Sequence, residues 1–234
     1  VTKAMVELGH TVEVISGQPY PILDEGVKLT KLPSLDLYSY DSPLKAFKFK
    51  LLKEPIDLYE WLSHLSGGFS EPYTFGERMA VWGRKNYNRF DVVHDNQTLA
   101  YGLIKLRDMG VPVVGTIHHP ITMDKRIDIK HAETLSLKLL KWRWYSFLKM
   151  QIKVARQLDP IIVVSENTRK DVVKDFKIDP KKTRKVLHGI DHKTFEPIPS
   201  IKRKKNQLIT TASADVPLKG LIYLIRAYSD LLND

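Results

Sequence analysis

The stretch "FDVVHDNQTLAYGLIKLRDMGVPVVGTIHH", Phe90–His119, decides the fold class of this chain. It opens on a short apolar run over 90–96, continues into a helical pattern that Gly110 closes, and ends in a second apolar run over 111–118. A glycine suits the left-handed backbone at a helix C-terminus. Strand, helix and strand in this order predict a βαβ unit, whose two strands lie parallel in one sheet.

The same alternation continues on both sides of this unit. Residues 1–16, "VTKAMVELGHTVEVIS", predict a helix followed by a strand, and roughly 130–157 predicts a long helix. "PIIVVSENT" then predicts a third buried strand, whose Ser165 or Asn167 can cap a helix over 169–176. "TRKVLHGID" predicts a fourth strand. The fold class we predict is α/β, a Rossmann-like, doubly wound parallel sheet.

Two segments of the chain interrupt this pattern. Prolines break the segment 17–90, which we expect to hold loops and one or two helices, including one over 75–88. Near the end, "SIKRKKNQ" (200–207) reads as a solvated linker, because four consecutive cations cannot be packed together. The sequence that follows predicts a new strand, a loop and a helix, as at the start of a second α/β domain.

Composition narrows the class of protein. A chain of 234 residues is long for one domain and short for two complete α/β domains, so one domain plus part of another fits. With 43% hydrophobic and 27% charged residues it should be globular. No cysteine is present, which excludes disulfides and thiolate metal sites and favours a cytoplasmic protein. No apolar run is long enough to predict a membrane span.

The positive charge lies in the second part of the chain. Residues 1–100 hold 11 Lys or Arg against 13 Asp or Glu, net −2, whereas residues 101–234 hold 26 against 14, net +12. Such a field attracts phosphates of any kind, whether of nucleotides, lipids or nucleic acids. A basic nucleic-acid-binding α/β module is therefore one alternative, although we recognise no motif of a standard nucleic-acid-binding module in the sequence.

Polar residues follow the apolar core of successive strands. Because the carboxyl ends of parallel strands meet at one edge of a sheet, where ligands bind, we expect these residues to line a common crevice. They are His94, Asp95, Asn96, His118, His119, Ser165 and Glu166. A metal-dependent hydrolase with His94, His118 and His119 as ligands is a second alternative. Adjacent histidines in a strand face opposite ways, however, which makes them poor joint ligands.

Six blocks in register make the chain resemble the retaining glycosyltransferases of family 4, which have the GT-B fold and include phosphatidylinositol mannosyltransferases. The blocks are "ELGHTVEVIS", "FDVVHDN", "VVGTIHH", "VVSENTRKDVVKDF", "VLHGIDHKTFEP" and "SADVPLKGLIYLIRAY".

The resemblance implies a division of the chain into domains. Residues 1–199 would be the acceptor-side Rossmann-like domain, 200–207 the linker, and 208–234 the start of the domain that binds a nucleotide sugar. The first strand and glycine-rich loop of the family, and its E-x7-E motif, are expected to lie outside this sequence. On that view the chain is a fragment, inactive alone, of an enzyme that transfers sugar to a hydroxyl with retention of configuration.

The resemblance also suggests roles for individual residues. His118 matches a histidine that reaches the transferred sugar, and is our candidate catalytic residue. An imidazole can donate to a sugar hydroxyl while accepting from a neighbour. Asp95 and Asn96 are candidate acceptor-side or sugar contacts. For His119 a structural role and an acceptor contact both remain open. His188 takes the place of a family asparagine and is interpreted as structural.

Lys219 is the candidate contact for the donor diphosphate. The family pattern G-R-x-x-x-x-K-G keeps its Lys and Gly here, but Ser213 and Ala214 stand where the Gly and Arg would be. Losing the Arg should weaken phosphate binding unless another cation or a helix N-terminus compensates. Asp215 is either a loop residue or a further sugar contact.

The resemblance implies no cofactor other than the nucleotide sugar as co-substrate. No Asp-x-Asp metal motif is present, and we expect no metal site. The expected partners are a nucleotide sugar and a carbohydrate or lipid-linked acceptor, and no nucleic acid. "SGGFSEP" (66–72) follows no strand, so it is interpreted as a turn near the acceptor mouth and not as a phosphate-binding loop.

The helix expected around 137–156 carries two distinct sets of residues. Leu137, Leu140, Trp144, Leu148 and Ala155 form an apolar face that should be buried on the sheet. The second set is a basic stripe with a tryptophan among its cations. Such a stripe is usually solvated, but it also suits peripheral contact with an anionic membrane, at the inner face for a cytoplasmic protein. It consists of Lys138, Lys141, Trp142, Lys149, Lys153 and Arg156.

Overall fold

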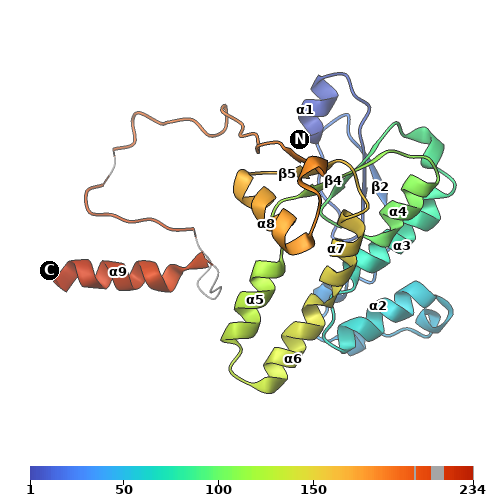
Figure 1. Ribbon diagram of the computed structural model, residues 1–234, viewed down its shortest axis with the longest axis horizontal. Helices are drawn as coiled ribbons and strands as arrows, with labels where there is room; N and C mark the ends of the chain where they lie inside the picture. The colour runs from blue at the N-terminus through green and yellow to red at the C-terminus, as the bar shows by residue number, and fades with distance from the viewer. Residues whose placement is uncertain (203, 212–218, 234) are drawn as a thin grey trace.

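The centre of the protein is a four-stranded parallel sheet. The computed structural model describes residues 1–202, 204–211 and 219–233. Its main sheet has the order β3-β4-β5-β6, and every neighbouring pair is parallel (Figure 1). The strands are β3 (Val93–Asn96), β4 (Val113–Ile117), β5 (Ile161–Val163) and β6 (Thr183–Lys185). The expected Rossmann-like parallel α/β architecture is confirmed.

A second, two-stranded parallel sheet lies at the N-terminal side. It pairs β1 (Glu13–Ser16) with β2 (Lys28–Lys31), Glu13 opposite Lys28. The Glu13 carboxylate also binds the guanidinium of Arg89, with Oε2 2.8 Å from Nη2. Arg89 belongs to the short segment before β3, so this contact links the small sheet to the start of the large one.

Helices connect the strands and bury their side chains. Between β3 and β4 runs α4, α7 precedes β5, and α8 packs on β5 and β6. Their bounds, and those of the other helices, are α1 (Thr2–Glu7), α2 (Pro55–Leu65), α3 (Glu71–Gly83), α4 (Tyr101–Asp108), α5 (Thr122–His131), α6 (Leu135–Trp144), α7 (Leu148–Ala155), α8 (Glu166–Phe176) and α9 (Leu221–Asn233). The fully buried side chains of the core include Leu99, Leu103, Ile117, Leu158, Ile161, Val163, Val172 and Phe176.

Two glycines bring α3 and α4 into close contact. A Cβ on Gly102 would collide with the backbone carbonyl of Gly76, and one on Gly76 would collide with Ala100. The absence of both side chains therefore allows the two helices to pack backbone against backbone. This packing sets the position of α3 against the central unit.

The N-terminal part of the chain contains more regular structure than predicted. The helix and strand expected over 1–16 are present as α1 and β1. The helix expected over 75–88 starts and ends earlier, as α3, and α2 is the second of the one or two helices expected in this segment, although the sequence did not place it. The strand β2 was missed. In β2 only Leu29 is apolar, so no alternating pattern marks the strand. The prolines around α2 obscured the helix, although Pro55 occupies its favourable first position.

The long helix expected over 130–157 is broken. Residues 132–134 separate α5 from α6, and the side-chain hydroxyl of Thr134 caps α6 by accepting from the amide of Leu137. Two short strands also differ from expectation. β6 ends at Lys185 and not near 191, and the strand expected after the linker is absent from 208–211, the described part of that segment.

The apolar face predicted for 137–156 is only half correct. Leu148 and Ala155 on α7 are buried at 3% and 0% exposure, but Leu137 and Leu140 on α6 are 44% and 48% exposed. The reason is the direction of α6, which packs against α5 and projects from the sheet with it (Figure 1). The prediction failed because helical periodicity identifies a face but not what lies opposite it.

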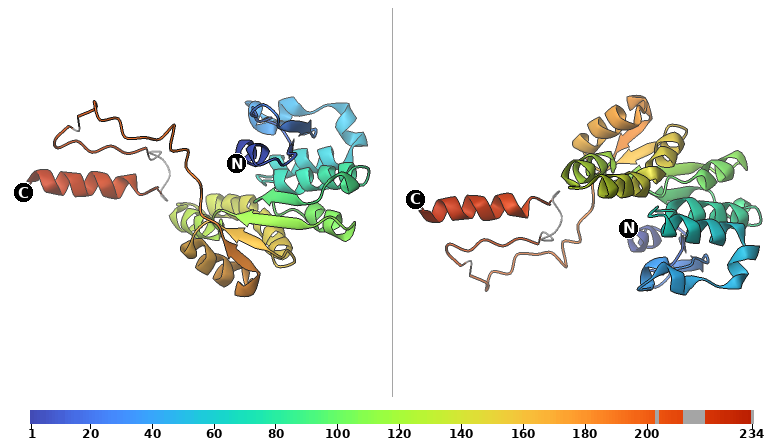
Figure 2. Two further views of the ribbon diagram at one scale, coloured as in Figure 1. Left: turned by 90° about the horizontal axis from the view of Figure 1, so that it is seen from above. Right: turned by 90° about the horizontal axis from the view of Figure 1, so that it is seen from below.

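The C-terminal segment lies apart from the sheet. After β6 the chain runs without regular structure through 186–202, and α9 stands away from the sheet in all three views (Figures 1 and 2). The helix predicted after Gly220 is confirmed as α9. The division of the chain into two domains and a linker stays a prediction.

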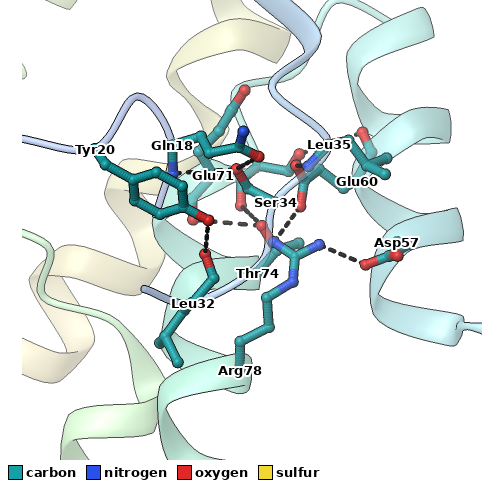
Figure 3. Close-up of polar contacts among 11 residues, drawn as sticks. Gln18, Tyr20, Leu32, Ser34, Leu35, Asp57, Glu60, Glu71, Thr74 and Arg78 are labelled. Carbon is teal, nitrogen blue, oxygen red and sulfur yellow. Dashed lines mark hydrogen bonds and ion pairs between the residues drawn. The ribbon is translucent and has the colours of Figure 1, made fainter. Parts of the chain in front are cut away.

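A buried charged cluster holds the irregular segment before α2 against α2 and α3 (Figure 3). Arg78 of α3, whose side chain is 7% exposed, bridges two carboxylates of α2: its Nη1 lies 2.5 Å from Glu60 Oε2, and its Nη2 lies 2.6 Å from Asp57 Oδ1. The amide of Leu35 donates to Glu60 Oε1 at 3.0 Å. A buried charge is tolerated only when it is paired in this way.

Replacing Arg78 with Met should destabilise the chain by about 3–5 kcal/mol, because Glu60 would remain buried and unpaired. The double variant Glu60→Gln/Arg78→Met should recover part of that loss, since it removes the Glu60 charge together with the guanidinium that neutralises it. Urea unfolding followed by circular dichroism measures both. Arg84→Met, on an exposed position at the end of the same helix, is the control, and an equal loss in the single and double variants would contradict the pairing.

Candidate functional site at the carboxyl ends of the strands

The polar residues of β3 alternate between two faces of the sheet. His94 and Asn96 share one face, where His94 Nε2 lies 2.6 Å from the Thr116 hydroxyl of β4. Asn96 Oδ1 accepts from His118 Nε2 at 2.7 Å. These residues follow Val93, the last apolar residue of β3, as the sequence predicted. Strand alternation therefore decides which of them can reach the rim.

Asp95 points the other way, into the protein. Its side chain accepts from the amide of Leu99 at 2.9 Å, and the residue is 6% exposed. Burial raises the pKa of Asp95, and the hydrogen bonds to Thr98 and Leu99 oppose that rise. Its carboxylate thus organises the turn between β3 and α4, and the contact of Asp95 with a sugar stays a prediction.

Gln97 joins the ends of β3 and β4. Its Oε1 accepts from the His118 amide at 2.6 Å, and its Nε2 donates to the His119 carbonyl at 2.8 Å. Gln97 itself has a positive φ of 65°, which turns the chain sharply after β3. Its carbonyl in turn accepts from Gln151 of α7 at 3.1 Å. The backbone of the histidine pair is thus held from the neighbouring strand.

The start of α8 holds the other side of the histidine. Ser165, predicted as a possible cap, is the N-cap of α8 and accepts from the Thr168 amide at 3.0 Å. Thr168 donates its hydroxyl to the His118 carbonyl at 3.1 Å. The N-terminus of α8, with its free amides and partial positive charge, therefore lies next to His118.

The ring of His118 is stacked on a second imidazole. Its ring centroid is 5.2 Å from that of His188, and the planes differ by 8°. Because His118 Nε2 faces the oxygen of Asn96, that nitrogen carries the proton, and Nδ1, 3.5 Å from His188 Nε2, is left with a lone pair. Burial, with the nearby imidazoles of His188, His119 and His94, lowers the pKa of His118.

The ring of His119 is directed towards the helix that follows. Its Nε2 lies 3.3 Å from Asp124 Oδ2 of α5. The two histidines thus point to different sides, as expected for neighbours at the end of a strand. His118 faces β3 and His188, and His119 faces α5.

The donor-side residues lie far along the chain from this rim. Lys219 is exposed and lies two residues before α9, and Gly220 has a positive φ of 70°. Asp215, together with Ser213 and Ala214, lies outside the described residues.

The described residues contain no group of three or more His, Cys, Asp or Glu side chains that could hold a metal ion. His94 faces Thr116 and His119 faces Asp124, so the three histidines of the hydrolase hypothesis do not converge. In addition, no helix in the described part of the chain is both long and apolar enough to cross a membrane.

A parallel α/β sheet with a histidine held at its carboxyl edge is the arrangement of a Rossmann-like glycosyltransferase domain. Comparison with known families agrees: residues 1–194 match the profile of Glycosyltransferase Family 4, and the chain belongs to that family.

One characterised relative is the MMP alpha-(1->4)-mannosyltransferase of Mycolicibacterium hassiacum. It is 44% identical to this chain over 99% of the chain's residues. The chain spans 56% of the length of that relative. Family membership makes the protein a glycosyltransferase by class, in place of the hydrolase and nucleic-acid-binding alternatives.

Sequence reasoning missed three residues of the site. Gln97 and Thr168 were not singled out, and His188 was interpreted as structural without any contact to His118. An amide or hydroxyl next to a strand end was the available signal for the first two. For His188 no local signal exists, because it stacks across a separation of 70 residues.

Removing the stacked imidazole should raise the pKa of His118. In the folded chain that pKa lies below the ordinary value of 6.5, so between the two values the unfolded chain binds more protons. His118 therefore contributes stability above pH 6.5 that is lost as the pH falls through its folded pKa.

The His188→Ala variant should shift the titration midpoint of the His118 ring upward, towards 6.5, as followed by two-dimensional NMR of the imidazole nitrogens. His192→Ala removes a nearby imidazole that has no contact with His118 and should leave the midpoint in place. A midpoint that does not move in His188→Ala would contradict the stacked pair.

Proposed function

We propose that the whole protein transfers a mannosyl residue from a nucleoside diphosphate mannose to a hydroxyl of a carbohydrate acceptor, with retention of the anomeric configuration. Family membership establishes sugar transfer as the class of reaction. The name of the M. hassiacum relative supports mannose as the sugar.

The observation that carries this proposal is the support around His118. Asn96 holds its ring, Gln97 holds its amide, and Thr168 holds its carbonyl. A side chain held this closely can position a reacting sugar with little further loss of freedom. The neutral ring suits an uncharged sugar hydroxyl. Such a hydroxyl can displace His188 and donate to Nδ1, or it can take the place of Asn96 and accept from Nε2.

Lys219 and the first amides of α9 would face the donor diphosphate. A helix N-terminus with an adjacent cation is a suitable site for phosphate oxygens. In the reaction, the bond between the anomeric carbon and the diphosphate breaks while the acceptor oxygen bonds to that carbon, and the proton of the acceptor hydroxyl leaves with the nucleoside diphosphate or passes to solvent. The transition state is oxocarbenium-like, so stabilising the departing diphosphate is the main electrostatic task. We propose that transfer needs no resident metal or cofactor.

Transfer by the whole protein should release nucleoside diphosphate with mannosyl donors and only slowly with glucosyl donors. GDP- and UDP-linked mannose and glucose, each with an α-linked mannose oligosaccharide as acceptor, form the test panel. The product linkage, read by NMR, should be α, and EDTA should not change the rate. Release that requires a glucosyl donor, or a β product, would refute the proposed reaction.

His118→Ala should lower the turnover number by about 100-fold or more, the low end for a positioned catalytic side chain. His10→Ala is the matched control, because it alters an exposed histidine in the turn between α1 and β1. Unchanged turnover in His118→Ala with the fold intact would remove His118 from the site.

We also propose that α6 contacts an anionic membrane surface, as a lipid-linked acceptor would require. Trp142 is 53% exposed and lies between two cations, with Lys125 Nζ and Lys149 Nζ 5.4 Å and 5.1 Å from its ring centroid. Four leucines of α6 are also exposed, namely Leu135, Leu137, Leu139 and Leu140. An indole flanked by cations and apolar side chains can enter a headgroup layer while the cations meet anionic lipids.

Three members of the predicted basic stripe have other contacts, among them Lys153, whose Nζ lies 5.5 Å from the ring centroid of Tyr101. Lys141 pairs with Asp128 at 3.1 Å, and Arg156 donates to the Phe176 carbonyl at the end of α8. The cations left for a membrane are therefore those around Trp142, including Lys138 and Lys149.

The Lys138→Glu/Lys149→Glu/Trp142→Ala variant should lose binding to phosphatidylglycerol vesicles in a sedimentation assay, whereas the parent chain should bind them and not phosphatidylcholine vesicles. Each cation near an anionic surface contributes about 1 kcal/mol, so binding should fall as salt is raised. Lys50→Glu/Lys53→Glu, on exposed lysines before α2, controls for net charge. Parent chain that stays in the supernatant with both lipids would exclude membrane contact.

A further inference from the structure

A pocket lined by aromatic rings lies where α2, α3 and the start of α4 meet the end of α6 and the start of α7. Its volume is about 350 Å³, at the small end of the range for ligand sites. Figure 1 labels the helices that contribute its walls. Its aromatic lining residues are Tyr59, Phe69, Tyr73, Tyr101 and Phe147, and its polar ones are Ser63, Ser70, Arg143, Ser146 and Lys149.

Three of the aromatic residues form a continuous row of tyrosines. The ring centroids of Tyr59 and Tyr73 are 5.1 Å apart, those of Tyr73 and Tyr101 are 6.4 Å apart, and neighbouring rings meet edge to face. None of the three hydroxyl groups makes a hydrogen bond to another residue in the part of the chain that the structure describes. The row thus presents ring faces and free hydroxyl groups together.

Polar side chains from α2, from the turn before α3 and from the segment 143–149 also line the pocket. Arg143 donates to the hydroxyl groups of Ser63, Ser66 and Ser146 at 3.0–3.1 Å. Among the described residues no carboxylate pairs with Arg143 or with Lys149. The turn over 66–70, interpreted from the sequence as lying near the acceptor mouth, supplies Phe69 and Ser70 to this pocket.

We infer that this pocket binds a sugar unit of an oligosaccharide acceptor. The C–H face of a pyranose buries apolar area against an aromatic ring, and its ring of hydroxyl groups needs donors and acceptors at the rim. The tyrosine rings with their free hydroxyl groups, together with the ammonium group of Lys149, offer both. A lipid chain would leave these polar groups without partners, at a cost in free energy. This inference deepens the proposed function and rests on it for the identity of the sugar.

The pocket is connected to the His118 site through two short links. Gln151 follows the lining residue Met150 and donates to the carbonyls of Gln97 and Thr98 at 3.1 and 3.2 Å. The turn that begins with Gln97 ends at α4, whose first residue is Tyr101. We expect an acceptor that reaches both places, with its terminal sugar near His118 and an earlier sugar in the pocket, to bind more tightly than a single sugar.

The test is isothermal titration of the 234-residue chain with α-(1→4)-linked mannotetraose and with mannose. The parent should bind the tetraose more tightly than mannose. Tyr59→Ala and Tyr101→Ala should each weaken tetraose binding by about three- to tenfold, the effect of losing one aromatic contact. Tyr59→Phe keeps the ring and should lose about threefold or less. Tyr87→Ala, a partly exposed tyrosine outside the pocket, is the matched control.

Folding of each variant is checked by thermal unfolding, and Tyr59 is 47% exposed, so its removal leaves the core intact. Tetraose binding that is absent, or equal in the parent and both alanine variants, would overturn the pocket assignment whether or not the whole protein transfers mannose. Tyrosine-dependent binding would uphold it, and failure of the transfer assay would then count against the proposed reaction alone.

Discussion

The carboxamide of Gln97 is the interaction on which the site depends. A single side chain pairs with both the amide of His118 and the carbonyl of His119, across the gap between two strands. Backbone groups beyond the end of a strand have lost their ladder partners and must find others. Gln97 supplies both, and so fixes where the first histidine leaves the sheet.

The same residue connects this site to the helical layer. Gln151 on α7 binds the carbonyls of Gln97 and Thr98, and α7 packs into the buried core through Val154 and Ala155. A movement of α7 would therefore displace the turn after β3, and through Gln97 it would displace the backbone of His118. Networks of this kind are most rigid when every polar atom is satisfied, and here one is not, because Gln151 Oε1 is buried without a hydrogen-bond partner in the part of the chain that the structure describes. The bonds that Gln151 Nε2 and the Gln97 carboxamide do make still position the turn after β3.

The positive charge of the second part of the chain serves the fold as well as ligands. Arg156 donates to the carbonyl at the end of α8, and Arg126 pairs with Asp175 of that helix. Arg143 holds three serine hydroxyl groups at the wall of the pocket. A net charge of +12 over 101–234, counted from the sequence, does not distinguish cations with internal partners from those that face solvent. The structure makes that distinction, and among the described residues it shows Lys138 and Lys149 near Trp142 without a carboxylate partner.

The sequence alone determined the order of strands and helices in the central unit. Apolar runs, a glycine after a helix (Gly110) and a serine cap before one (Ser165) act on the backbone within a few residues, so they can be recognised locally. It also brought the histidine pair to the end of a strand. Only the tertiary structure decided that Asn96 and not Asp95 meets His118, because side chains alternate along a strand and a shift of one residue exchanges its faces. Only it joined His118 to Gln97, Thr168 and His188, which lie 21, 50 and 70 residues away along the chain. Contacts over such separations depend on how the elements pack, and no local pattern specifies that packing.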